Sequence, residues 1–294
     1  MRIASLLPAA TEIAAAVGLT DDLVAVTFEC DHPAGIRDRV PVVVDTALPV
    51  GLTPGEIDAV VRDRVARGLP MYEMDADALG RLAPDLILTQ DLCRVCALPA
   101  GTVADALAVI GSDAEVLSID PHTVDEVLDA VAAVGRRGGA AAAAEAVVGD
   151  LRSRLAAVAA AVAGRTRARV LVLEWTDPPF LAGHWVPELV RRAGGEPVAG
   201  VEGGRSVTAA WDELRDAGAD LVLVAPCGYD LDAAVEQAAV VRDRLPGVPI
   251  VAIDSAAYVV RAGPRLVDGV EALAWALHPG AVPAPPEGRV LRLG

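Results

Sequence analysis

The stretch AAAAAEAVVGDLRSRLAAVAAAVAGR, residues 140–165, separates two halves of the chain that follow the same pattern. It is rich in alanine and contains no proline, so it predicts one helix, which at 1.5 Å per residue would be roughly 35 to 40 Å long. A helix of that length can connect two lobes. We therefore expect an N-terminal α/β lobe over residues 1–138, a bridging helix over 139–165 and a C-terminal α/β lobe over 166–294.

Each half alternates apolar strand-like runs with amphipathic helical segments. LVAVT (23–27) and DLILTQ (85–90) read as strands in the first half, and TPGEIDAVVRDRVARG (53–68) predicts a surface helix that opens with a threonine N-cap. The second half repeats the pattern around RVLVLEW (169–175) and DLVLVAP (220–226). Such alternation is typical of parallel sheets covered by helices. The predicted fold is α/β, with two Rossmann-like lobes joined by one long helix.

Composition excludes several classes of partner. The 294 residues carry a net charge of -16 and no basic run, which disfavours nucleic acid and anionic membrane surfaces. No run of about 18 uncharged apolar residues predicts membrane insertion. The first residues are apolar, but Pro8, Thr11 and Glu12 interrupt them before they could form a signal-peptide core, and no lipobox cysteine follows. We expect a cytosolic protein.

Familiar catalytic motifs are missing from the sequence. It contains no G-x-x-x-x-G-K-[ST], no G-x-S-x-G and no H-E-x-x-H. The sequence leaves open whether the protein is an enzyme, and it favours a binding function.

The four cysteines all follow predicted strands. Cys30 lies three residues after LVAVT, Cys93 and Cys96 lie just after DLILTQ, and Cys227 follows DLVLVAP directly. Ligands of parallel sheets bind at the carboxyl ends of strands, so a cleft between the lobes would let these thiols converge. In a reducing cytosol they would be thiols or metal ligands rather than disulfides. Zinc or iron–sulfur binding, a redox-active thiol set, and thiols that line a ligand cleft all remain open, and any one of them alone could be a small buried hydrophobe.

Other polar and aromatic residues fall on the same loops. Trp175 and Trp185 lie in loops beyond a strand, which suits the face of a planar ligand. Arg261 could pair with a ligand carboxylate or phosphate. His122 and His278 lie beside prolines or turns and are expected at the surface. The full set of candidate ligand-binding residues is Glu29, Asp31, Gln90, Asp91, Glu174, Trp175, His184, Trp185, Tyr229 and Arg261.

Three stretches carry a resemblance to a known family: RIASLLPAATEI (2–13), DLVLVAPCGYD (220–230) and VVRAGPRLVDGVEAL (259–273). Together with the long helix they resemble the BtuF-like, cobalamin- and iron-chelate-binding class of ABC-transporter substrate-binding proteins. The resemblance implies two α/β lobes joined by a rigid helix, little movement between them, and a large planar ligand such as a corrinoid, haem or ferric siderophore.

A finer resemblance is to a signal-less, cytosolic "cobalamin-binding protein" branch, on the residues 29–31, 93–97 and 226–228. Our first interpretation is a cytosolic protein whose interlobe cleft holds a corrinoid-like or other metal-containing ligand, lined or ligated by the four cysteines. Docking to a permease is not expected without export. Two alternatives are a thiolate metal or iron–sulfur enzyme on a binding-protein scaffold, and an exported transport receptor whose start site is misassigned. The candidate cofactors are an iron–sulfur cluster, zinc or a corrinoid.

Overall fold

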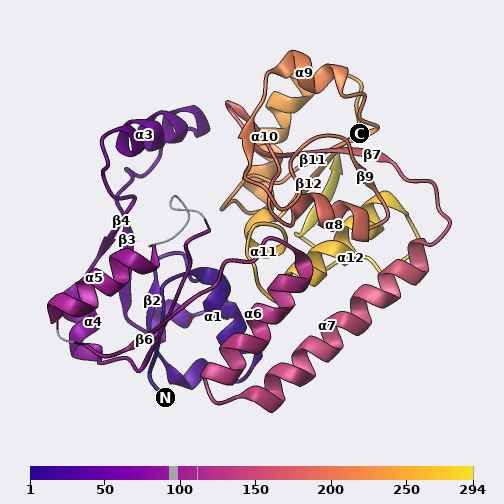
Figure 1. Cartoon of the computed structure of the whole chain (residues 1–294). Coiled ribbons are helices and arrows are strands. Elements are labelled where there is room, and N and C mark those ends of the chain that lie inside the picture. Colours follow the sequence, from indigo (N-terminus) through magenta and orange to yellow (C-terminus); the bar gives the residue numbers. More distant parts are fainter. Residues whose placement is uncertain (93–98, 111, 294) are drawn as a thin grey trace. The chain divides into compact units, whose positions relative to one another are not determined.

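The computed structural model describes residues 1–92, 99–110 and 112–293, and these residues form two compact α/β units (Figure 1). The long helix expected over 139–165 is present as α7, Ala141–Val162. Unit 1 comprises Met1–Pro121 and Leu128–Gly149, and unit 2 comprises His122–Val127 and Asp150–Gly294.

The sheet of unit 1 has the strand order β4-β3-β2-β1-β5-β6. All neighbouring strands run parallel except β4, which pairs with β3 in the antiparallel direction. The strands are β1 (Ile3–Ser5), β2 (Leu23–Thr27), β3 (Val42–Thr46), β4 (Tyr72–Met74), β5 (Leu86–Thr89) and β6 (Glu115–Ser118).

Local sequence signals set the helices of unit 1. Pro8 occupies the first turn of α1, where its missing N–H costs nothing. Thr53 and Glu56 form the capping box that starts α3. The helices are α1 (Pro8–Ala16), the 3₁₀ turn η1 (Thr20–Asp22), α2 (Ile36–Arg39), α3 (Pro54–Ala66), α4 (Ala76–Leu82), α5 (Ala100–Ile110) and α6 (Val124–Arg137), which begins in unit 2.

The sheet of unit 2 has the order β10-β8-β7-β11-β12-β13, with β9 beside β7. Its centre, β7, β11 and β12, is parallel, whereas β8, β10 and β13 join in the antiparallel direction. The strands are β7 (Arg169–Thr176), β8 (Pro179–Leu181), β9 (Glu196–Pro197), β10 (Val207–Thr208), β11 (Leu221–Val224), β12 (Ile250–Ile253) and β13 (Val290–Leu293).

Helices surround this second sheet (Figure 1). Asp230 starts α10 and Asp254 starts α11, because each carboxylate accepts a backbone N–H of the first turn. An apolar core under α10 contains Leu171, Val222 and Val241. The helices are α8 (Val186–Arg192), α9 (Trp211–Asp216), α10 (Leu231–Arg244), α11 (Ser255–Tyr258) and α12 (Leu266–Leu277).

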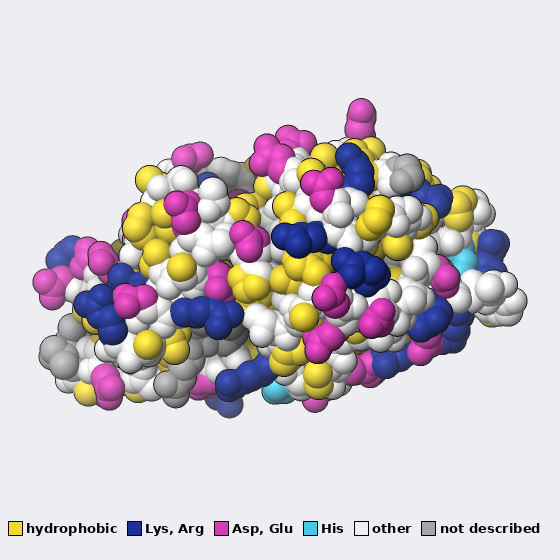
Figure 2. Space-filling view, turned by 90° about the horizontal axis from the view of Figure 1, so that it is seen from above, with side chains coloured by type: hydrophobic (Ala, Val, Ile, Leu, Met, Phe, Trp, Pro, Cys, Tyr) yellow, Lys and Arg dark blue, Asp and Glu magenta, His cyan; other side chains and the backbone are white. Residues whose placement is uncertain are grey.

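The two-lobed α/β prediction is confirmed, with one refinement. Both sheets are mixed rather than purely parallel, because short edge strands that the sequence pattern did not reveal add in the antiparallel direction. Within the described residues, no helix combines the length and the apolar character that crossing a membrane requires. Figure 2 shows acidic and basic side chains interspersed on one face of the molecule, rather than gathered by sign.

Candidate functional site

The carboxyl ends of β7 and β11 meet at one edge of the unit 2 sheet. The two strands are parallel and adjacent, and the N–H of Cys227, which follows β11, donates to the carbonyl of Glu174 near the end of β7 over 3.0 Å. The next loop joins this edge as well, since the N–H of Ala256 donates to the carbonyl of Tyr229 over 3.0 Å. Four residues expected at a ligand site, Glu174, Trp175, Cys227 and Tyr229, are therefore neighbours at this edge, as the strand-end argument predicts.

Two aromatic rings pack together there. The centroids of Trp175 and Tyr229 are 5.5 Å apart and their planes are inclined by 57°. The indole N–H of Trp175 donates to the carbonyl of Asp177 over 3.0 Å, which fixes the ring. Both residues are half-buried, so part of each ring is open to solvent. We call Trp175 and Tyr229 the aromatic pair.

An exposed thiol lies beside this pair. The side chain of Cys227 is exposed. Burial, together with the charge of a Cys227 thiolate, raises the pKa of the Tyr229 phenol above its ordinary value. The aromatic pair and this thiol together offer two apolar rings, inclined to each other, next to a soft sulfur ligand.

Glu174 is partly buried. Its carboxyl accepts hydrogen bonds from the Ser206 hydroxyl and from the Gly183 N–H, the latter over 3.4 Å. Burial raises the pKa of Glu174 to about 7, although both hydrogen bonds act in the opposite direction. Ser206 was not predicted from the sequence, because nothing in the sequence indicates a contact across 32 residues.

His184 lies beside this carboxyl in a strained backbone conformation, with φ at 50°. Its Nδ1 atom is buried and has no hydrogen-bond partner among the described residues. The ring lies 6.0 Å from that of His122, centroid to centroid. Burial lowers the pKa of His184, and the charges of His122 and Arg205 lower it further. A neutral imidazole is therefore favoured here.

Trp185 and Arg261 lie elsewhere in unit 2. Trp185 is 5% exposed, and its indole N–H donates to the carbonyl of Val259 over 2.8 Å. It therefore packs in the core, and little of its ring is left for the ligand face that we expected. Arg261 is half-buried in the segment between α11 and α12.

The two histidines that were expected at the surface differ in their exposure to solvent. His122 is exposed, as predicted, and its Nδ1 pairs with the carbonyl of Gly203 over 3.0 Å. For His278 the prediction is wrong: this residue is 6% exposed, and its Nε2 lies 3.1 Å from the carbonyl of Gly194. Gly194 lies so close to the imidazole that a Cβ on it would be 2.5 Å from Nε2.

In unit 1, Cys30 is packed into the interior. It is 0% exposed, and the Oγ1 atoms of Thr11 and Thr27 lie 3.0 and 3.5 Å from its sulfur. This environment is that of a small buried side chain rather than of a thiol facing an open cleft.

The remaining unit 1 candidates lie at the strand ends. Glu29 and Gln90 are half-buried and Asp31 is exposed. The Asp91 carboxylate accepts the N–H of Ala100 over 2.9 Å and so caps the start of α5. The backbone N–H of Asp91 in turn donates to Asp120, a carboxylate that sequence reasoning missed.

The hypothesis of a four-cysteine centre gains no support from these positions. Cys93 and Cys96 lie outside the described residues. Over residues 1–92, 99–110 and 112–293, no group of three or more His, Cys, Asp or Glu side chains is arranged to hold a metal ion.

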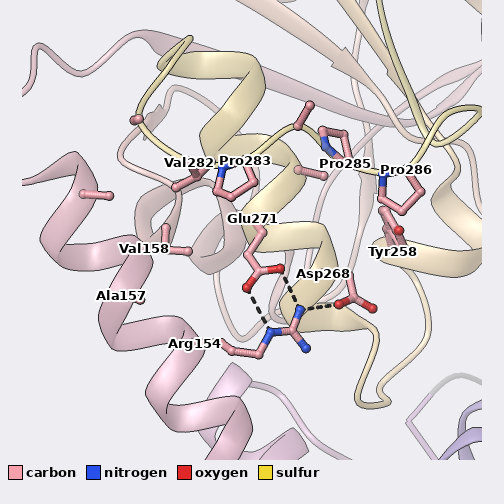
Figure 3. A pocket seen from close by; sticks show the side chains of 14 residues that line it. Arg154, Ala157, Val158, Tyr258, Asp268, Glu271, Val282, Pro283, Pro285 and Pro286 are labelled. Carbon is pink, nitrogen blue, oxygen red and sulfur yellow. Dashed lines mark hydrogen bonds and ion pairs between the residues drawn. The ribbon is translucent and has the colours of Figure 1, made fainter.

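A separate pocket of about 460 Å³ lies within unit 2, between α7, α12 and the chain segment 281–286 (Figure 3). Arg154 of α7 donates to both oxygens of Glu271, over 2.9 and 2.6 Å, and also to Asp268. These hydrogen bonds raise the pKa of Arg154 above its ordinary value. The opposite wall is apolar and is formed by Val282 and the neighbouring prolines. None of the residues predicted from the sequence lines this pocket.

Comparison with known proteins places the chain in a family. A search of curated protein sequences gives no match. Among solved structures, the chain resembles a periplasmic haem-binding protein from Pseudomonas aeruginosa, with 21% identity, a TM-score of 0.71, and coverage of 100% of this chain and 98% of that one. It also resembles the periplasmic haem-binding protein RhuT from Roseiflexus sp. RS-1, with 20% identity, a TM-score of 0.68, and coverage of 95% and 98%.

A third similar structure is the periplasmic vitamin B12 binding protein BtuF of Vibrio cholerae, with 20% identity, a TM-score of 0.64, and coverage of 94% and 96%. These likenesses establish the two-lobed fold. The family model described as periplasmic binding protein matches residues 3–246. The chain therefore belongs to the periplasmic binding protein family.

Proposed function

We propose that this protein binds a planar metal chelate of the haem or corrinoid class, and that the unit 2 edge formed by the aromatic pair and Cys227 contacts it. The observation that carries the proposal is the aromatic pair, half-open to solvent at the carboxyl ends of β7 and β11. Two of the structurally similar proteins bind haem and vitamin B12, whose ring systems are flat and largely apolar. A flat ring system is the partner that exposed aromatic side chains bind best.

Charge supports the same class of ligand. Arg205 is exposed, and it lies close enough to His184 to lower the pKa of that imidazole. Its guanidinium suits the carboxylate groups that decorate many tetrapyrroles. The ligand would then place its ring on the aromatic pair and an acidic edge toward Arg205.

Of the four cysteines, the proposal assigns metal coordination to Cys227 alone. A soft thiolate can coordinate the iron or cobalt at the centre of such a chelate, and Cys227 is exposed beside the pair. Participation of the other three cysteines is not part of the proposal, because Cys30 is buried in unit 1 and Cys93 and Cys96 lie outside the described residues.

We propose further that the protein acts in the cytosol, where the exposed thiol of Cys227 stays reduced. Cell fractionation with a tagged chromosomal copy tests this location. Recovery of the mature protein in an extracytoplasmic fraction would favour the transport-receptor alternative instead.

The binding proposal is tested by titrating the purified, reduced protein with haemin and with hydroxocobalamin, followed by absorption spectra. We expect saturable binding of one of the two, weakened about tenfold by Trp175→Ala, since loss of one stacking partner is worth about 1 kcal/mol or somewhat more. Trp211→Ala is the matched control, because Trp211, the first residue of α9, packs against the apolar core of unit 2 rather than at the strand ends. Equal effects of the two variants, or no binding of either chelate, would refute the proposal.

Cys227→Ser tests the thiol separately. If the sulfur coordinates the metal, the metal-sensitive absorption bands shift in this variant while the ring still binds. Unchanged bands would remove Cys227 from the metal-ligand set and leave the aromatic pair as the binding surface.

A further inference from the structure

The pocket under the chain segment 281–286 is a cavity that the proposed function does not use. Its volume of about 460 Å³ falls within the roughly 300 to 1,000 Å³ of typical small-molecule sites. It lies between α7, α12 and this segment, with Tyr258 at the end of α11 beside it (Figure 3). It shares no lining residue with the aromatic pair or Cys227, so a molecule bound here would be a separate ligand.

The segment 281–286 is anchored at both ends, so the pocket is formed before any ligand binds. At its start, the N–H of Ala281 donates to the carbonyl of His278 over 2.9 Å. Beyond its end, the side chain of Arg289 pairs with that of Asp254, whose N–H donates to the carbonyl of Arg289 over 2.8 Å. The three prolines of the segment fix its backbone and carry no N–H. The segment is therefore a stiff wall with few hydrogen-bond donors.

Small side chains keep the pocket open. Ala157 and Ala161 lie four residues apart on one face of α7, and Ala272 lines the pocket from α12. Val282 and the prolines complete an apolar lining. An alkyl chain that enters this space is removed from water, which favours binding of an apolar body.

The polar wall of the pocket carries an excess of negative charge. Arg154 lies between the carboxylates of Asp268 and Glu271, so the three groups together carry one negative charge. Arg154 engages both oxygens of Glu271, over 2.9 and 2.6 Å, but only one oxygen of Asp268. The second oxygen of Asp268 takes no bond from Arg154 (Figure 3). The three side chains are 31 to 36% exposed, so a ligand can reach them.

Tyr258 lies within the field of this charge. Burial raises the pKa of the Tyr258 phenol, and the charge of Asp268 raises it further, although the nearby Arg289 acts in the opposite direction. The same negative potential that disfavours a phenolate here favours a cation. The phenol also offers a hydroxyl that can donate or accept a hydrogen bond.

We propose that this pocket binds a small organic cation of the alkylammonium class, with its ammonium group at the second oxygen of Asp268 and its apolar body under the segment 281–286. An anion would meet the excess negative charge, and a bare metal ion would gain nothing from the apolar lining. A neutral alkyl compound would fill the space without the ionic contact. The net charge of -16 on the chain attracts cations toward the protein as well.

The experiment compares three probes with the same alkyl body: n-hexylammonium chloride, n-hexanol and hexanoate. Each is titrated into the whole protein near neutral pH and low salt, and the assigned ¹H–¹⁵N spectrum is followed. We expect hexylammonium to bind saturably, with shifts at residues 154–161, 268–272 and 281–284. Because the charged groups are partly exposed and screened by water, it should bind only about tenfold more tightly than hexanol. Hexanoate should cause no shift in these segments.

Several results would overturn the proposal. They are equal affinities for hexylammonium and hexanol, shifts confined to other parts of the chain, and the absence of any saturable shift with hexylammonium.

Two variants change the charge of the pocket in opposite directions. Asp268→Asn makes the pocket neutral and should weaken hexylammonium about tenfold, to the level of hexanol. Arg154→Met makes it more negative and should tighten hexylammonium. Asp243→Asn, an exposed site on α10 outside the pocket, removes the same charge and should leave the affinity unchanged. Weaker binding in both pocket variants would show a structural effect and contradict the charge argument.

Ala161→Leu tests the location of the probe without a change of charge. Leucine is a good helix former, and its side chain should occupy the pocket from α7, so hexylammonium and hexanol should both lose affinity. Unchanged binding of both probes would place them elsewhere and overturn the proposal. Titration of this variant with haemin and hydroxocobalamin should match wild type, so failure of this pocket and failure of the proposed function are distinguishable.

Discussion

Gly269→Ala should destabilise the protein, against the usual trend for a helix interior. Gly269 lies in the middle of α12, where alanine normally gains about 1 kcal/mol over glycine. Here, however, a Cβ would lie 2.0 Å from the carbonyl oxygen of Tyr258, the last residue of α11. Ordinary contact begins near 3.4 Å, so one helix must move by more than 1 Å.

The expected magnitude follows from these two opposing effects. Overpacking a core contact costs about 1–3 kcal/mol, and more where the obstacle is backbone, as here. After the helix-propensity gain of alanine is subtracted from this cost, the free energy of unfolding should fall by about 2 kcal/mol. This loss lowers Tm by about 4 to 8 °C for a unit of this size. Urea unfolding followed by tryptophan fluorescence, with a thermal scan beside it, measures both quantities.

Gly149→Ala in α7 is the matched control. A Cβ at Gly149 meets nothing within 4 Å, so this exposed helical site should gain about 0.5–1 kcal/mol. If Gly269→Ala is as stable as wild type or more so, the close contact between α11 and α12 does not constrain the fold, and the reasoning fails.

Three further changes probe other contacts. Trp185→Phe should cost about 1–2 kcal/mol of unfolding free energy, because it leaves the buried carbonyl of Val259 without its donor; a urea midpoint equal to that of wild type would contradict this. Arg154→Met should lower the free energy of unfolding by about 1 kcal/mol at low salt and by less in 1 M salt, because it leaves the carboxylates of Asp268 and Glu271 facing each other. Arg62→Met, which breaks the ion pair of an exposed arginine, is the control and should cost under about 0.5 kcal/mol. Cys30→Ala should cost about 1–2 kcal/mol and leave the metal content of the purified protein unchanged; loss of metal would restore the hypothesis of a thiolate centre that includes Cys30.

The sequence indicates most of the fold through signals that act over a few residues. The strand 23–27 is present with the predicted bounds, and the helix that Thr53 caps ends at Ala66, two residues before the predicted end. Hydrophobic period, capping and proline placement are properties of neighbouring residues, so they are readable without the rest of the molecule. The short edge strands β4 and β13 escape this reading, because pairing with an existing sheet stabilises them more than their own composition does.

The candidate site likewise has features that the sequence predicts and features that only packing decides. That Cys227 and Tyr229 lie at this edge follows from their positions after β11. Trp175 was expected in a loop beyond its strand, but it lies within β7, where it pairs with Phe180 of β8. That Trp185 faces the core, and that Cys30 sits between two threonine hydroxyls, was decided by packing.

The sequence by itself therefore determined the α/β alternation, the long helix and the sheet edge that carries the candidate ligand-binding residues. Only the tertiary structure decided that Glu174 meets Ser206, that His278 is buried against Gly194, and that Arg154 of α7 pairs with two carboxylates of α12. The physical reason is that such contacts join residues tens of positions apart. Their existence depends on how whole elements pack, and their energies depend on the burial that this packing creates.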